Sequence, residues 1–291
     1  MNNCDYPALY IASDNASERS QKKHLSLVQS YSFLLIAGAG LSVIGIDSSI
    51  SAAFAALFFL ASIFVSILMF MKNSENSWYR ARAVAESVKT SAWRFMMRAD
   101  PYEDSPSVIE VKKNFRNLLR SILSEHKDLA HELGGEVSTK EQITAKMCEV
   151  RNASLEERMD FYKMYRIDEQ RKWYAVKSKR NASNANLWFG ILIVLQFIAV
   201  LLVILRVAYP EWKYWPTEVF VVAAGAVLTW IQLKRFRELA AAYGLTAHEI
   251  GVIKGDLESV SNQHEFSQFV KDSENAFSRE HTQWVARKDE S

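Results

Sequence analysis

Three His-Glu pairs in the sequence resemble the start of a zinc-protease motif. They are His131-Glu132, His248-Glu249 and His264-Glu265. A helical zinc site needs a second histidine four residues after the first, so that both imidazoles lie on one helix face, and none of the pairs has one. The sequence also lacks a G-x-S-x-G, a P-loop and a G-x-G-x-x-G pattern. We therefore expect no enzymatic activity, and no catalytic residue, metal ion or cofactor.

The segment from Lys163 to Arg180 has the composition of an anion-binding site. It holds seven Lys or Arg residues against two acidic residues, with aromatic residues between them. Positive charge attracts phosphate, and aromatic faces stack on bases. Alternatively, a basic stretch beside a membrane sets the topology and meets anionic lipid head groups. Both interpretations stay open, and the ligand-binding candidates in the segment are Arg166, Arg171, Trp173 and Tyr174.

Small residues recur at helical spacing along two apolar segments. The first series is Gly38, Ser42, Gly45 and Ser49, and the second is Ser51, Ala55, Ser62 and Ser66. Small residues let helix backbones approach closely, whereas polar residues inside a membrane need a partner helix or a water-filled lumen. Close packing and a pore therefore remain alternatives. If a pore exists, the candidates to line it are Gly38, Ser42, Gly45, Ser62 and Ser66.

These candidates lie in or beside two blocks, roughly 31–71 and 187–233, that hold almost no charge although 23% of all residues are charged. A helix of about 20 residues crosses the hydrocarbon core of a bilayer, which is about 30 Å thick. Each block has room for two such helices, and the links between them are short enough to demand antiparallel hairpins. The predicted spans run from about Leu25 or Tyr31 to Ile46, from Ile50 to Met71, from Leu187 to Ala208 and from Thr217 to Leu233. This pattern excludes a single ordinary soluble domain.

Basic residues flank the spans on one side, and the two hairpin tips hold only Lys213 between them. Because Lys and Arg resist translocation, both termini and the long middle segment are predicted to be cytoplasmic. The predicted organisation is a cytoplasmic segment at 1–30, a transmembrane hairpin at 31–71, a cytoplasmic helical region at 72–186, a second hairpin at 187–233 and a last cytoplasmic helical region at 234–291.

The cytoplasmic regions are predicted to be helical. Apolar residues recur at helical spacing from Trp78 to Phe95 and from Phe236 to Leu257, which indicates one long amphipathic helix after each hairpin. Ser154 and Glu157 have the spacing of a capping box, so a further helix should start there and lead towards the third span. Gly134-Gly135 predicts a turn or flexible joint. The predicted fold class is therefore an all-α membrane protein: four transmembrane helices in two hairpins, with long amphipathic helices forming a cytoplasmic domain. The order of hairpin and helices predicts a two-fold repeat.

Two sets of spaced residues resemble the SLATT superfamily. One set is Tyr162-x3-Arg166-x3-Gln170-x2-Trp173-Tyr174-x2-Lys177, with Glu274-x3-Ser278-Arg279-Glu280-x3-Trp284 near the C-terminus. The other set is similar to a second SLATT subfamily: Tyr10-x-Ala12-Ser13-Asp14-x2-Ser17-x3-Gln21, with Trp78-x3-Arg82-x3-Glu86-x6-Trp93. Together the two sets cover nearly the whole chain, as two SLATT-like halves.

The resemblance implies a membrane effector of bacterial conflict systems, which acts beside a nucleotidyltransferase and forms pores that end the life of an infected cell. On this basis we expect an anti-phage effector in the bacterial inner membrane, gated by a nucleotide or oligonucleotide signal. Four spans can hardly enclose a wet lumen, so we expect a homo-oligomer, with a tetramer as the working number. Arg82, Arg94 and Arg98 are the next ligand-binding candidates. The alternative is a membrane scaffold that binds a partner protein and does not conduct.

Overall fold

Helices account for nearly all the regular structure in a computed structural model that describes residues 1–44, 49–104, 107–127, 129, 132–133 and 139–289. They are α1 (Ala8–Ile44), α2 (Ser49–Lys72), α3 (Ser74–Met96), α4 (Val108–Glu125), α5 (Ala145–Asn152), α6 (Leu155–Tyr162), α7 (Glu169–Ala208), α8 (Thr217–Lys234), α9 (Phe236–Asp256) and α10 (Gln263–Asp289). Short 3-10 turns lie at Asn3–Asp5 and Leu257–Ser259, and a π-helical turn, η5 (Lys163–Asp168), joins α6 to α7. No strand occurs in these ranges, which confirms the all-α class.

Four helical stretches are long and apolar enough to cross a membrane, as predicted. They run over Ala8–Ile44, Ser49–Met96, Leu155–Ala208 and Thr217–Ser259. All four extend far beyond the apolar spans: α1 already begins at Ala8, a continuous helix leads into the third span from Leu155, and the second and fourth stretches continue to Met96 and Ser259. The predicted tip residues Asp47 and Ser48, the candidate Gly45 and the pair Gly134-Gly135 lie outside the described residues.

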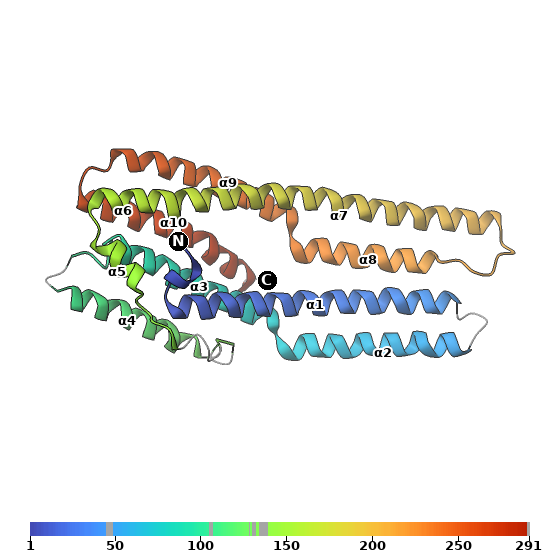
Figure 1. The fold of residues 1–291 in the computed structure, drawn as a ribbon. Helices are drawn as coiled ribbons and strands as arrows, with labels where there is room; N and C mark the ends of the chain where they lie inside the picture. Colours follow the sequence, from blue (N-terminus) through green and yellow to red (C-terminus); the bar gives the residue numbers. More distant parts are fainter. Residues whose placement is uncertain (45–48, 105–106, 128, 130–131, 134–138, 290–291) are drawn as a thin grey trace. The chain divides into compact units, whose positions relative to one another are not determined.

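Each hairpin is held together by small and aromatic residues. A Cβ atom placed on Gly38 of α1 would lie 2.8 Å from Cε1 of Phe59 on α2, so this glycine permits the close approach of the two helices. In the second hairpin the rings of Trp188 and Trp230 lie 6.1 Å apart. Figure 1 shows α2 beside the second half of α1, and α8 beside the second half of α7. Many apolar side chains on these helices are exposed, which is the surface that lipid covers.

The chain forms two compact units. The first contains residues 1–22, 74–173 and 247–291, and the second contains 23–73 and 174–246, with all four apolar spans. In the first unit, α3 contacts α4, α5 and α10. Its core is aromatic: Trp93, Phe95 and Phe115 are fully buried, and the rings of Phe95 and Phe115 lie 5.2 Å apart.

Two helix starts in the first unit have different causes. The capping box at Ser154 is confirmed, because its side chain accepts a hydrogen bond from the amide of Glu157, whose carboxylate accepts one from the amide of Ser154. The start of α1 instead depends on residues far along the chain. The amide of Ala8 donates to the carbonyl of Glu141 at 3.1 Å, and the amide of Leu9 donates to the side chain of Gln142 at 3.0 Å. No local pattern could reveal these distant partners.

Candidate functional site

Arg166 and Glu274 form a buried ion pair in the first unit. Nε of Arg166 donates to Oε1 of Glu274 at 2.8 Å, and Nη2 donates to Oε2 at 2.7 Å. The two side chains are only 2% and 0% exposed. The hydroxyl of Tyr162 donates to the same carboxylate at 2.9 Å. Such a two-pronged contact fixes the guanidinium plane as well as its position.

Aromatic rings close around this pair. The guanidinium carbon of Arg166 lies 5.0 Å from the ring centre of Phe277 and 6.0 Å from that of Trp93. Nε1 of Trp93 donates to the hydroxyl of Tyr6 at 3.2 Å. Burial raises the pKa of Tyr6 to about 12, and burial followed by the Glu274 charge raises the pKa of Tyr162 well above its usual value. Both phenols therefore stay protonated at neutral pH and can donate.

The structure separates the four ligand candidates of the basic segment. Arg166 is turned inward from η5, and its charge is balanced by Glu274, which favours a structural role. Tyr174 is buried, with its ring 5.5 Å from that of Tyr243 in the second unit. Arg171 and Trp173 are exposed. Ligand binding by this segment therefore stays a prediction. Of the four candidates, Arg171 and Trp173 could contact a ligand without a rearrangement.

In each half of the chain, an acidic residue before the first span of the hairpin forms an ion pair with a basic residue after the hairpin. In the first half, Nη1 of Arg82 lies 3.0 Å from Oδ1 of Asp14, and its Nη2 lies 2.7 Å from Oε1 of Glu86. In the second half, Nζ of Lys254 lies 2.6 Å from Oδ1 of Asp168. Since the first-half residues belong to the spaced set that runs from Tyr10 to Trp93, part of that set is explained by helix pairing.

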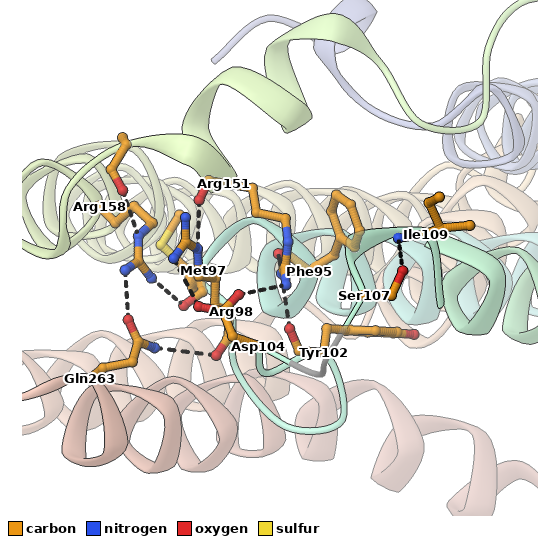
Figure 2. A network of polar contacts seen from close by, with 11 residues as sticks. Phe95, Met97, Arg98, Tyr102, Asp104, Ser107, Ile109, Arg151, Arg158 and Gln263 are labelled. Atoms are coloured by element: carbon orange, nitrogen blue, oxygen red, sulfur yellow. Dashed lines mark hydrogen bonds and ion pairs between the residues drawn. The ribbon is translucent and has the colours of Figure 1, made fainter. Parts of the chain in front are cut away.

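Three arginines meet at the C-terminal end of α3, and we call Arg98, Arg151 and Arg158 the arginine cluster (Figure 2). Arg151 donates through Nη1 to the carbonyls of Phe95 at 2.6 Å and Tyr102 at 2.9 Å. Its guanidinium also lies 5.0 Å from the ring centre of Phe95.

The other two members complete the network. Nη1 of Arg158 donates to the carbonyl of Met97 at 2.9 Å, and its Nη2 donates to Oε1 of Gln263 at 2.6 Å. Nε of Arg98 donates to the carbonyl of Arg151 at 2.8 Å. The last carbonyls of a helix have no partner within the helix and carry partial negative charge, so guanidinium groups stabilise this end of α3.

One carboxylate, that of Asp104, binds the arginine cluster in the described part of the chain. Oδ2 of Asp104 lies 2.8 Å from Nη1 of Arg98, and Oδ1 lies 3.3 Å from Nη2 of Arg151. Burial, and then the charge of Arg98, lower the pKa of Arg158 to about 10 although Asp104 opposes this. Three guanidinium groups therefore lie around a single carboxylate in this part of the structure.

Sequence reasoning named Arg98 but missed Arg151, Arg158 and Asp104. Nothing local marks the two arginines, because their burial depends on the end of α3, where their carbonyl partners lie 56 and 61 residues earlier in the chain. The last candidate, Arg94, lies nearby but donates elsewhere: its Nη2 donates to Oδ1 of Asn275 at 2.7 Å.

The pore-lining candidates fall into two groups. Gly38 and Ser62 are buried, whereas Ser42 and Ser66 are exposed. The hydroxyls of Ser42 and Ser66 each donate at 3.0 Å to the backbone carbonyl four residues earlier, and Ser62 donates to the carbonyl of Phe59 at 2.8 Å. Buried Gly38 and Ser62 fit helix packing, and exposed Ser42 and Ser66 keep the pore interpretation open.

Among the residues with assigned positions, no three His, Cys, Asp or Glu side chains come together as a metal site. His131, the first residue of one His-Glu pair, lies outside them.

Comparison with known proteins divides the chain into two matches. Residues 7–159 match the family described as SMODS and SLOG-associating 2TM effector domain 3, and residues 162–284 match SMODS and SLOG-associating 2TM effector domain 1. Each match contains one hairpin, α1–α2 or α7–α8. No curated protein and no solved structure matches the chain. SLATT domains are two-helix membrane effector domains associated with anti-phage defence systems. The chain is therefore a multi-pass membrane protein of the SLATT family, with one SLATT domain in each half.

Proposed function

We propose that this protein is an anti-phage effector that forms an oligomeric pore or ion channel, opens or shuts in response to a nucleotide or oligonucleotide signal, and so arrests or kills the infected cell. The observation that carries the proposal is the presence of two effector domains, each with a membrane hairpin, on one chain. Because each effector domain contains a membrane hairpin, the membrane is the structure on which the protein would act.

Several copies are needed for a water-filled path. Four spans can bury their polar faces against one another, but they leave no room for a lumen, so a closed ring of subunits is the expected arrangement. The exposed hydroxyls of Ser42 and Ser66 are compatible with this role, because each is already bonded to its own helix and can face either water or lipid at little cost. A tetramer is the working number.

The proposed site of action is the bacterial inner membrane, with both termini in the cytoplasm. Basic residues supply the support: Lys72 and Arg80 follow the second span, and Lys234 and Arg235 follow the fourth, whereas the described part of the second hairpin tip holds only Lys213. The cytoplasmic regions would then meet a signal made by a neighbouring nucleotidyltransferase.

Conductance tests the proposal directly. Purified protein in a planar bilayer should give discrete current steps, and Ser66→Leu should lower their size by narrowing a lumen. The matched control is Phe64→Leu, an exposed residue about 200° round the helix from Ser66, which should leave the current steps unchanged. Absence of current from correctly oligomeric protein, under all signal conditions, would favour the non-conducting scaffold.

A further inference from the structure

The arginine cluster has more positive charge than its surroundings balance. Asp104 supplies one negative charge, and the end of α3 supplies about half a charge. Of the two other acids of the same loop, Asp100 is paired with a lysine, whereas Glu103 is bonded to a neutral hydroxyl and keeps its charge. Oδ2 of Asp100 lies 3.0 Å from Nζ of Lys271, and the carboxylate of Glu103 accepts a hydrogen bond from Ser267. Among described residues, one carboxylate, that of Asp104, contacts this cluster of three guanidinium groups.

The cluster is also reachable from solvent at one edge. Arg151 is 2% exposed, but the side chains of Arg98 and Asp104 are 25% and 55% exposed. The carboxylate therefore covers the two guanidinium groups from the outside, where another anion of similar geometry could take its place. Two arginines side by side match the oxygens of a phosphate group as well as those of a carboxylate.

The backbone at Arg98 is left-handed, as it is at Asn73 and Arg235. Arg98 has φ of 51°, in the left-handed region just after the end of α3. Glycine is the usual residue there, because any other residue is strained in this conformation. The arginine at this position has a strained backbone, and its guanidinium lies in the cluster.

We propose that the arginine cluster is a phosphate-binding site whose resting occupant is the Asp104 carboxylate, and that phosphate groups of a soluble nucleotide-type ligand displace it. The ligand class rests on the proposed function, since a nucleotide signal carries the phosphates that the site fits. Displacement frees the Asp104 side chain, while the arginines continue to cap the end of α3.

Binding of inorganic pyrophosphate to the full chain in phosphatidylcholine nanodiscs, measured by isothermal titration calorimetry, tests the site. Asp104→Asn removes the competing charge and should tighten binding at least tenfold. Arg98→Gly suits the left-handed backbone and should weaken binding at least tenfold. Arg235→Gly is the matched control, because Arg235 is also left-handed, with φ of 45°, at the end of α8, and it should bind as the unmodified chain does.

The proposal is overturned if Asp104→Asn binds no more tightly, or if Arg98→Gly binds as tightly as the unmodified chain. If Arg98→Gly loses hydrogen-exchange protection in α3, the Asp104→Asn result alone decides. If phosphatidylglycerol in the nanodisc abolishes pyrophosphate binding, the site serves lipid head groups and the assignment to a soluble ligand fails. If the protein conducts but the variants show none of these changes in binding, the pore proposal stands and the phosphate-site proposal fails. If the variants bind as expected but the protein never conducts, the phosphate-site proposal stands and the pore proposal fails.

Discussion

Replacing Glu274 by glutamine should destabilise the first unit severely, because it leaves Arg166 buried with its charge unbalanced. The substitution keeps the volume but removes the charge that accepts two guanidinium bonds and the bond from Tyr162. Breaking a buried ion pair by removing one partner costs about 3–5 kcal/mol. Since about 1.4 kcal/mol corresponds to a factor of ten, amide hydrogen exchange in α10 should accelerate by about two to four orders of magnitude.

The measurement is hydrogen–deuterium exchange by mass spectrometry on the full chain in nanodiscs. A matched variant removes the ion pair and the tyrosine hydroxyl together: Arg166→Met, Glu274→Leu and Tyr162→Phe. Replacing a whole buried ion pair by apolar residues is often neutral or stabilising, so this triple variant should recover most of the protection. The reasoning is refuted if Glu274→Gln changes exchange in α10 less than tenfold, or if the triple variant is as unprotected as the single one.

Two further outcomes follow from the packing and from the pKa shifts. Gly38→Ala should destabilise the first hairpin by about 1–3 kcal/mol through overpacking against Phe59. Gly40→Ala should not, because nothing lies within 4 Å of the added Cβ. Thermal denaturation in detergent compares the two variants, and equal melting temperatures would contradict the contact. Because burial raises the pKa of Tyr6 to about 12, the folded chain keeps a proton that the unfolded chain loses above about pH 10. The free energy of unfolding should therefore be independent of this group below pH 10 and fall by about 1.4 kcal/mol per pH unit between pH 10 and 12. In denaturation curves across this range, the free energy of unfolding of Tyr6→Phe should fall less steeply with pH. An identical slope would contradict the pKa shift.

Local patterns predicted the helices well, because hydropathy and helical spacing act within a few turns. The four spans, the long helix after each hairpin and the capping box at Ser154 all follow from nearby residues. The partners of the first amides of α1 could not be predicted, since they lie near residue 141.

The candidate site was harder to predict for the same reason. Basic composition drew attention to Arg166, but whether a guanidinium faces solvent or a buried carboxylate depends on α10, more than a hundred residues away. Arg151 and Arg158 give no local signal at all. Their burial follows from where α3 ends, and the sequence around them says nothing of that.

The π-helical turn has a consequence for how the chain tolerates deletions. An α-helical turn closes its hydrogen bond over four residues and a π-helical turn over five, so η5 (Lys163–Asp168) holds one residue more than a regular helix would need. Deleting one residue within η5 would restore regular bonding and leave the third span facing as before. Deleting one residue further along, for example at Lys179, would turn every later side chain of that span by about 100°. Within η5, therefore, the helix can be shortened by one residue without a rotation of the side chains of the third span.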